Sequence, residues 1–367
     1  MGLSDRGVRM RGGSGGSIGE EGRVQARVNH RSQPRVTLFF RRPWPVGSYS
    51  IEASFEAMLA AYPADAPLQP CRHVSGWFSQ GLLPRVRAIL EARRAATCVN
   101  HVTGDVHYLV FGLPRGRTVL TIHDCGFLHQ RRGVRRALLQ WLWLRLPVRF
   151  ATVVTVVSEA SRREVIALSG CAPGKVEVVP TSIDARFRPR PRGQAERPVV
   201  LHIGTTPNKN LERHVEALRG LPVRLCVVGA LDDAQRALLA RSGVEHEVRS
   251  RLSTEEMVEA YAAADLLLFA STFEGFGMPI LEAQAVGRPV VTANLSSMPE
   301  VGGDAACYVD PFDPASIRAG VQRVLADADY RAGLVERGLR NVERFAAATT
   351  ARSYARIYTR LAGAADG

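Results

Sequence analysis

Short apolar runs alternate with amphipathic stretches along the chain from about residue 35 onward. Runs of four to six residues rich in valine, isoleucine and leucine predict buried strands, and apolar residues spaced i, i+3, i+4 predict helices. The first half gives strands at 36–40, 97–102, 118–122, 153–157 and 176–179, and helices at 50–62, 105–111, 134–149 and 159–168. This alternation is typical of a parallel sheet covered by helices.

A segment rich in proline and arginine at 186–197 interrupts the pattern and predicts a linker between two domains. The alternation then restarts, with strands at 199–203, 224–228, 266–269 and 289–292, helices at 210–218, 233–240, 254–263 and 279–286, and three closing helices at 314–326, 328–345 and 349–361. We therefore expect an α/β protein with two doubly wound, Rossmann-like domains facing across a cleft, where ligands bind beyond the carboxyl ends of the strands. The predicted boundaries are a disordered basic tail at 1–33, an N-terminal domain at 34–185, the linker, a C-terminal domain at 198–346, and a C-terminal helix and tail at 347–367.

The net charge of +13 favours an anionic partner, which a nucleic acid, a membrane surface or a phosphate-bearing substrate would each supply. A nucleic-acid-binding protein is disfavoured because the arginines are spread along the chain and do not alternate with aromatic residues. The six cysteines form no C-x-x-C pair, which predicts reduced thiols. No signal peptide or membrane-spanning run is visible, so we expect a cytoplasmic protein.

The densest polar cluster follows the predicted strand at 266–269. Gly275 and Gly277 let the backbone approach a ligand, and the helix that begins at Pro279 offers free N–H groups to a phosphate. Glu274 and Glu282 lie at the two ends of this segment, where carboxylates suit the hydroxyls of a hexose and a ribose. Alternatively, Glu282 alone is a solvated acid in the first turn of a helix.

A second glycine turn, with Gly204 and Thr205, precedes Lys209 at the start of the next predicted helix. A lysine in this position is a suitable partner for a diphosphate, although a surface lysine is the simpler alternative.

Together these segments resemble the family 4 glycosyltransferases, which are retaining enzymes of the GT-B fold. The resemblance rests on the Glu-x7-Glu spacing of Glu274 and Glu282, on Gly287-Arg-Pro-Val-Val-Thr and Ser296-Ser-Met-Pro-Glu300 after it, and on Val157-Ser158-Glu-Ala-Ser161 before it. It implies that C-terminal helices pack back toward the first domain and that Lys209 neutralises a nucleoside diphosphate. It also implies donor contacts from Gly47, Ser48, Gly204, Thr205, Gly275, Phe276, Gly277, Met278, Pro279 and Glu282. Many relatives carry an arginine a few residues before this lysine, which the chain lacks. Either backbone amides take over its function, or the enzyme belongs to a branch whose motif begins Gly-Thr, which we favour.

In the first half, the resemblance makes His123 a residue of the donor-sugar pocket and Asp124 its support or an acceptor contact. Without the family resemblance, a single histidine after a strand would more often have a structural role. His101 and Asp105 are weaker acceptor-side candidates, and Asp105 also suits the N-cap of the helix at 105–111. The glycine loop with Gly47 and Ser48 matches the family only in part, and an ordinary loop before a helix capped by Ser50 explains it equally well.

The segment at 131–145 is rich in arginine, leucine and tryptophan. It suits either contact with an anionic membrane face or a partly buried helix of the first domain.

We therefore expect Glu274, Lys209 and His123 to be catalytic in the transfer of a hexose, with mannose as a candidate, from a nucleoside diphosphate sugar to a saccharide or lipid-linked hydroxyl, with retention. No metal or other cofactor is expected, because no Asp-x-Asp lies at a strand end. A nucleotide-sugar epimerase or phosphorylase of the same architecture and a catalytically silent nucleotide-sugar-binding scaffold remain alternatives.

Overall fold

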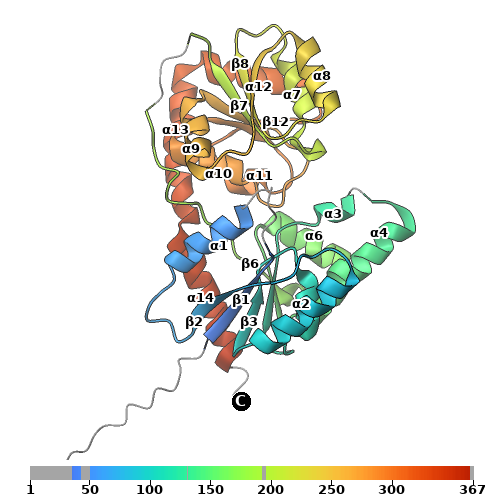
Figure 1. Cartoon of the computed structure of the whole chain (residues 1–367). Helices are drawn as coiled ribbons and strands as arrows, with labels where there is room; N and C mark the ends of the chain where they lie inside the picture. The colour runs from blue at the N-terminus through green and yellow to red at the C-terminus, as the bar shows by residue number, and fades with distance from the viewer. Residues whose placement is uncertain (1–34, 43–49, 130, 192–195, 364–367) are drawn as a thin grey trace, which may run out of the picture. The chain divides into compact units, whose positions relative to one another are not determined.

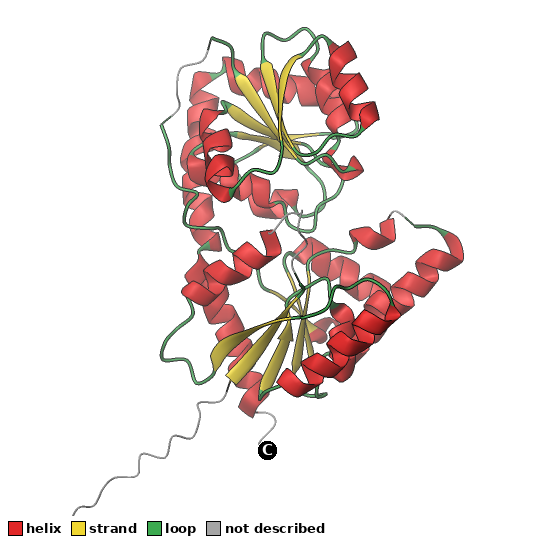
Figure 2. Ribbon diagram, in the orientation of Figure 1, coloured by secondary structure: helices red, strands yellow, loops and turns green. Residues whose placement is uncertain are grey.

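Two parallel six-stranded sheets, each packed against helices, form the framework of the protein (Figures 1 and 2). This computed structural model describes residues 35–42, 50–129, 131–191 and 196–363. The predicted tail at 1–33, the loop with Gly47 and Ser48, the Ser50 side chain and residues 192–195 of the predicted linker lie outside the described residues. The predicted α/β class with two doubly wound sheets is confirmed.

The first sheet has the strand order β2-β1-β3-β4-β5-β6, with every neighbouring pair parallel. Its strands are β1 (Arg35–Phe40), β2 (Gln69–Val74), β3 (Val99–Val102), β4 (Thr118–Ile122), β5 (Val153–Val156) and β6 (Val176–Val178). Strands β3, β4 and β5 are buried at every residue, because helices cover both faces of a parallel sheet and leave no solvated side.

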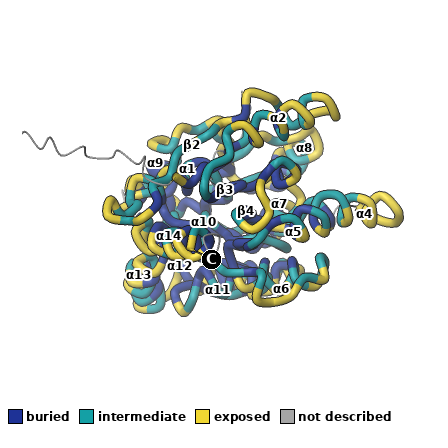
Figure 3. Tube along the Cα trace, turned by 90° about the horizontal axis from the view of Figure 1, so that it is seen from below, coloured by how far each residue is buried: buried dark blue, intermediate teal, exposed yellow. Residues whose placement is uncertain are grey.

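Helices of the first half divide between the two faces of this sheet. Hydrophobic side chains of α2 (Leu82–Ala95), η1 (His107–Gly112), the π-helical turn η2 (Gln140–Arg145), α5 (Leu146–Phe150) and α6 (Glu159–Ser169) pack on one face. The other face packs against α1 (Ser50–Ala60) and the last helix, α14 (Ala347–Gly363). The short helices α3 (Gly126–His129) and α4 (Gly133–Leu139) extend from β4 toward η2, and Figure 3 shows α4 mainly in the colour of exposed residues.

The second sheet has the order β12-β11-β10-β7-β8-β9. Its strands are β7 (Val199–Ile203), β8 (Arg224–Val228), β9 (Glu245–Arg249), β10 (Leu266–Phe269), β11 (Val290–Ala293) and β12 (Cys307–Val309). Its helices are α7 (Leu211–Leu218), α8 (Asp233–Ser242), α9 (Thr254–Ala263), α10 (Met278–Val286), α11 (Met298–Gly302), α12 (Pro314–Ala326) and α13 (Ala328–Val342). The strand order reverses between β7 and β10, so the loops after these two strands diverge and leave a crevice at the carboxyl edge of the sheet.

The predicted return of the C-terminal region to the first domain is confirmed for α14. Its buried Tyr354, Ile357 and Tyr358 join the hydrophobic cluster that contains Val36, Leu38 and Phe40 of β1. Tyr358 also bonds His101 through its hydroxyl, with 2.6 Å between Oη and Nδ1.

Several local predictions were wrong. The predicted helix at 105–111 is a 3-10 turn that begins at His107, and Asp105 has a φ of 37° and does not cap it. Strands β2, β9 and β12 and helices α2, α3 and α11 were not predicted. All six cysteines are free, as expected. Within the described ranges, no helix is long and apolar enough to cross a membrane.

Candidate active site

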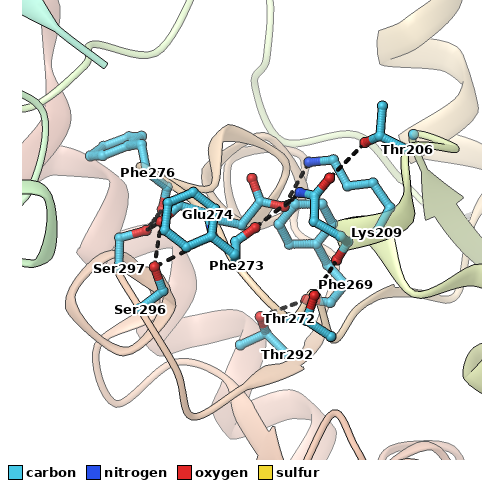
Figure 4. A network of polar contacts seen from close by, with 12 residues as sticks. Thr206, Lys209, Phe269, Thr272, Phe273, Glu274, Phe276, Thr292, Ser296 and Ser297 are labelled. Atoms are coloured by element: carbon cyan, nitrogen blue, oxygen red, sulfur yellow. Dashed lines mark hydrogen bonds and ion pairs between the residues drawn. The ribbon is translucent and has the colours of Figure 1, made fainter. Parts of the chain in front are cut away.

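Lys209 and Glu274 form an ion pair where the strand order of the second sheet reverses. Lys209 follows β7, Glu274 follows β10, and their Nζ and Oε1 atoms lie 2.7 Å apart (Figure 4). Both side chains are mostly buried, and the ammonium group lies 4.6 Å from the centre of the Phe269 ring. The sequence predicted both residues as site residues, and the topology of the sheet brings them together.

Gly204 makes room for the lysine. Its φ of 88° is a left-handed conformation that favours glycine, and a Cβ atom there would lie 2.9 Å from Cγ of Lys209. The lysine stem therefore lies across the glycine turn. Thr205 donates its hydroxyl to the Ala230 carbonyl at 2.6 Å, which anchors the turn to the end of β8.

Asn208 ties the β7 turn to the β10 loop. Its side-chain amide donates to the carbonyl of Phe273 at 2.9 Å, and its own carbonyl accepts from the Thr272 N–H at 2.8 Å. These two hydrogen bonds join the loop that carries Lys209 to the loop that carries Glu274, and so fix the two charged residues relative to each other. The sequence shows Asn208 next to Lys209, but it did not predict that Asn208 links the β7 turn to the β10 loop.

Two serines fix the glycine loop from the other side, as Figure 4 shows. Ser296 donates to the carbonyl of Glu274 at 2.5 Å, and Ser297 donates to the carbonyls of Glu274 at 3.0 Å and Phe276 at 2.7 Å. The loop ends at Gly277, whose φ of 107° starts α10, so the helix begins at Met278 and Pro279 is its second residue. Among the described residues no side chain caps this helix start, which leaves the backbone N–H of Met278 available to a ligand.

Glu282 lies one turn into α10 and lines a cavity of ≈ 470 Å³. The Tyr261 hydroxyl donates to its Oε2 across 2.6 Å. Burial raises the pKa of the Glu282 carboxyl from 4.5 to about 7, while the bond from Tyr261 and the charge of Lys209 act in the opposite direction. The alternative of a solvated helix acid is therefore wrong. Tyr261 was missed because its apolar neighbours in α9 made it look like an ordinary core residue.

His123 lies at the end of β4, next to the glycine loop of the other half. Its carbonyl oxygen lies so close to Gly275 that a Cβ atom there would approach it to 2.3 Å. Ser158 and Ser161, at the start of α6, donate to the Gly275 carbonyl at 2.7 and 3.0 Å. The His123 ring donates from Nε2 to the Thr103 carbonyl at 2.8 Å, so Nδ1 takes no part in this bond.

The three predicted acceptor-side residues do not lie together in the structure. Asp124 is exposed and lines a second cavity next to Glu274. His101 is completely buried, and its ring nitrogens bond Tyr358 and Thr121, so in this structure it has no surface to offer an acceptor. Burial lowers the pKa of His101 to about 3, which keeps the ring neutral. Asp105 is paired with Arg41, with 2.6 Å between Oδ2 and Nη1.

The site thus places a cation, two carboxylates and an uncapped helix start at the carboxyl edge of the second sheet, where the strand order reverses. Among the described residues, no group of three or more histidine, cysteine, aspartate or glutamate side chains is arranged to hold a metal ion. A cation at a glycine turn suits an anionic group, and the carboxylates suit hydroxyl donors on either side of it.

Comparisons with known proteins agree with this arrangement. The first half matches the Glycosyltransferase Family 4 model over residues 23–187, and the second half matches the Glycosyl transferases group 1 model over residues 197–327. The chain is 30% identical over 296 residues to the O-antigen chain mannosyltransferase B of Escherichia coli, which covers 72% of this chain and 77% of that protein. It is 28% identical over 332 residues to a D-inositol 3-phosphate glycosyltransferase of Thermobispora bispora, which covers 81% of this chain and 76% of that protein.

Its fold is similar to that of Anabaena Alr3699/HepE, solved in complex with UDP-glucose. The TM-score is 0.72 at 17% sequence identity, and the match covers 89% of this chain and 100% of that one. The GT-B fold expected from the sequence is therefore confirmed. Because matches to both family models and a 30% identical relative agree with the residues around Lys209 and Glu274, the chain belongs to the family 4, group 1 glycosyltransferases.

Proposed function

We propose that this glycosyltransferase moves a hexose, with mannose as the first candidate, from a nucleoside diphosphate sugar to a hydroxyl group, with retention of anomeric configuration and without a metal ion. The observation that carries the proposal is the ion pair of Lys209 and Glu274 beside the cavity that Glu282 lines. Mannose is favoured by the similarity to the mannosyltransferase of Escherichia coli.

The nucleoside would occupy the cavity of ≈ 470 Å³ lined by Glu282, Phe187 and the loop at residues 250–254. This volume is within the range of about 300–1,000 Å³ that is usual for small-molecule sites. Glu282 would accept the ribose hydroxyls, with Tyr261 holding its second oxygen in place.

The diphosphate would lie between Lys209 and the start of α10. Without a donor, the lysine charge is compensated by Glu274 at 2.7 Å. A diphosphate is a stronger partner for an ammonium ion, so donor binding would draw Lys209 away and release Glu274 to accept hydroxyl protons of the sugar. A well-placed group that stabilises the leaving charge typically contributes about 3–4 kcal/mol to the transition state.

Retention follows if the acceptor hydroxyl attacks from the side that the diphosphate leaves. The C–O bond to the departing phosphate breaks, the new glycosidic bond forms on the same face, and the acceptor proton passes to the phosphate oxygen. Lys209 and backbone N–H groups would balance the charge of the leaving group, so a metal ion is not needed for that purpose. His123 would face the sugar from the first half, with Nδ1 not engaged in the bond to Thr103.

A thermal-shift panel of nucleoside diphosphates and their sugars tests the donor, and NMR of the anomeric proton in the product tests retention. We expect one nucleoside diphosphate series to stabilise the protein and the product to keep the donor configuration. An inverted product would overturn retention. Sugar turnover without any acceptor would point to an epimerase, phosphate-dependent release to a phosphorylase, and binding without turnover to a scaffold.

Transfer in excess chelator tests the metal-free part of the proposal. We expect activity to persist after EDTA treatment and gel filtration, because Lys209 and the free N–H of the α10 start are placed to balance the leaving diphosphate. A loss of activity that added magnesium or manganese restores would contradict metal-independent transfer.

The enzyme would meet an anionic membrane through α4 and the residues before it, which suits a lipid-linked acceptor. Residues 131–138 are exposed throughout and include four arginines. Val134 and Leu138 are 85% and 55% exposed, and Trp141 is 50% exposed. Arginines with exposed apolar side chains favour contact with an anionic lipid surface.

A further inference from the structure

A second cavity, of ≈ 590 Å³, is lined in part by the Glu274 loop. Asp124 and His129 line it from the first half, and Asn208, Thr272, Phe273 and Phe312 line it from the second. The two cavities share no lining residue, while Glu274 lines this one and Glu282 lines the other. A ligand in this second cavity would therefore reach the Glu274 carboxylate without occupying the cavity proposed for the nucleoside.

Aromatic rings form one part of the wall. His129 and Phe273 lie with ring centroids 4.5 Å apart, and Phe312 is 56% exposed although it is a large apolar side chain. The face of an aromatic ring is electron-rich and attracts the weakly positive C–H groups of a pyranose face. Exposing phenylalanine to water is unfavourable, so a ligand that covers Phe312 would gain free energy from its burial.

Hydrogen-bonding groups form the other part. Asp124 binds the Gly126 N–H with Oδ1 at 2.7 Å and has no cation as a partner within the described part of the chain. His129 is paired with Glu164, and the Glu274 carboxylate already holds Lys209. The cavity therefore carries an uncompensated carboxylate, which accepts hydroxyl protons and repels phosphate.

Arg213 lies near Phe312 and is a cation that could compensate the charge of Asp124. Its guanidinium lies 5.6 Å from the centre of the Phe312 ring and donates to Asn210 Oδ1 at 2.9 Å. It is not among the residues that line the cavity. The charge that faces a ligand is thus that of Asp124.

We propose that this cavity binds the acceptor as an uncharged pyranose, with a sugar face against Phe312 and Phe273 and its hydroxyls on Asp124. This inference rests on the proposed function and narrows the class of acceptor. The acceptor group next to the reacting centre is a neutral saccharide, whether or not that saccharide is attached to a lipid, and is not a phosphorylated sugar or polyol.

Saturation-transfer NMR with methyl α-D-mannopyranoside and with D-mannose 6-phosphate tests this, using the full chain with a saturating nucleoside diphosphate so that the proposed donor site is occupied. We expect saturation of the C–H protons of the methyl glycoside and a weaker effect for the phosphate at equal concentration. Phe312→Ala should weaken binding of the glycoside about 2- to 10-fold. Asp124→Asn should weaken binding of the glycoside and reduce the difference between the two probes. Phe111→Ala, which removes a 38% exposed phenylalanine of η1, is the matched control.

Thermal shifts with nucleoside diphosphates are measured on the same variants to separate this inference from the proposed donor site. Phe312→Ala should keep the wild-type nucleotide shift, since Phe312 does not line the nucleoside cavity. No binding of the methyl glycoside, tighter binding of the phosphate, or equal binding by Phe312→Ala would each overturn the neutral-acceptor site. A failure of nucleotides to bind while the glycoside binds would instead overturn the donor proposal.

Discussion

Tyr261 donates its hydroxyl proton to Glu282 Oε2 across 2.6 Å, in a place where the tyrosine is completely buried. The ring also contacts Phe187, with centroids 5.8 Å apart in an edge-to-face arrangement. Burial raises the pKa of Tyr261 well above its usual value, so it stays a proton donor at neutral pH. The carboxylate of Glu282 is therefore oriented by a residue that does not itself line the cavity of ≈ 470 Å³.

Tyr261→Phe should weaken nucleoside diphosphate binding about tenfold, because a hydrogen bond to a charged group typically contributes about 1.5–3 kcal/mol. The expected cause is loss of orientation and a further rise in the pKa of Glu282, which loses the bond that lowers it. Isothermal titration calorimetry measures the change. Tyr308→Phe, which removes a hydroxyl bonded to the Gly303 carbonyl, is the control. Unchanged affinity in Tyr261→Phe would show that Glu282 needs no such support.

The same pair makes a pH dependence testable. With a pKa of about 7, Glu282 gains its charge as the pH rises through neutrality, so wild-type affinity for ribose-containing ligands should rise over this interval. Glu282→Gln removes this part of the dependence, and Tyr261→Phe should move the midpoint upward. For folding, a pKa raised from 4.5 to about 7 means that the carboxyl contributes stability below pH 4.5, which is lost as the pH rises through 7.

Lys209→Ala and Glu274→Gln should each reduce transfer by about two to three orders of magnitude while the fold survives. Lys209 would no longer stabilise the leaving diphosphate, and the neutral amide that replaces the Glu274 carboxylate would accept sugar hydroxyls less strongly. Steady-state kinetics and circular dichroism measure the two effects. Lys175→Ala, at a lysine that bonds the Arg149 carbonyl at 3.3 Å, is the control. Turnover within a few-fold of wild type would remove the changed residue from the mechanism.

Much of the candidate site was predictable, because Lys209 and Glu274 follow strongly apolar strands and carry distinctive glycine neighbours. Tyr261 and Phe312 were not, because their functions depend on contacts between elements far apart in the chain. His101 shows the opposite error. A histidine in a polar run looked accessible, but α14 returns from the end of the chain and buries it against Tyr358.

The predicted fold failed mainly where apolar alternation is weak. Strand β9 is exposed at its first four residues, and β2 is only partly buried, so their sequences lack the pattern of central strands. Helix α2 contains Pro84 and exposes Leu82 and Leu83, which hid its periodicity. Central strands such as β4 and β10, whose residues are all buried, were predicted with their observed bounds.

Gly275→Ala should lower both activity and stability, because the added methyl group would lie 2.3 Å from the His123 carbonyl oxygen and 2.7 Å from Asp124 Cβ. The loop or the end of β4 must then move, which would disturb the Ser158 and Ser161 bonds to Gly275. Overpacking of this kind typically costs about 1–3 kcal/mol. Thermal unfolding and transfer assays measure it. Gly174→Ala, where nothing lies within 4 Å of the added atom, should behave as wild type.

Four arginines lie before and within α4. Arg131, Arg132, Arg135 and Arg136 are all exposed, and they neighbour Val134 and Leu138 along the same segment. Trp143 is only partly exposed, and Arg85 of α2 lies over its ring, 4.7 Å from the centroid. Trp141 stays exposed. The proposed membrane-contact surface is therefore α4, the two arginines before it and Trp141.

Changing the four arginines to glutamine should weaken co-sedimentation with anionic liposomes, since each basic side chain near such a surface contributes roughly 1 kcal/mol. Binding should also fall steeply with salt, because the Debye length shortens from about 10 Å at 0.1 M to about 3 Å at 1 M. The matched control changes four exposed arginines on other helices, Arg241, Arg323, Arg352 and Arg356, to glutamine, so that the net charge falls equally. Equal losses in both variants would assign the binding to net charge, and equal sedimentation with neutral liposomes would leave α4 as an ordinary exposed helix.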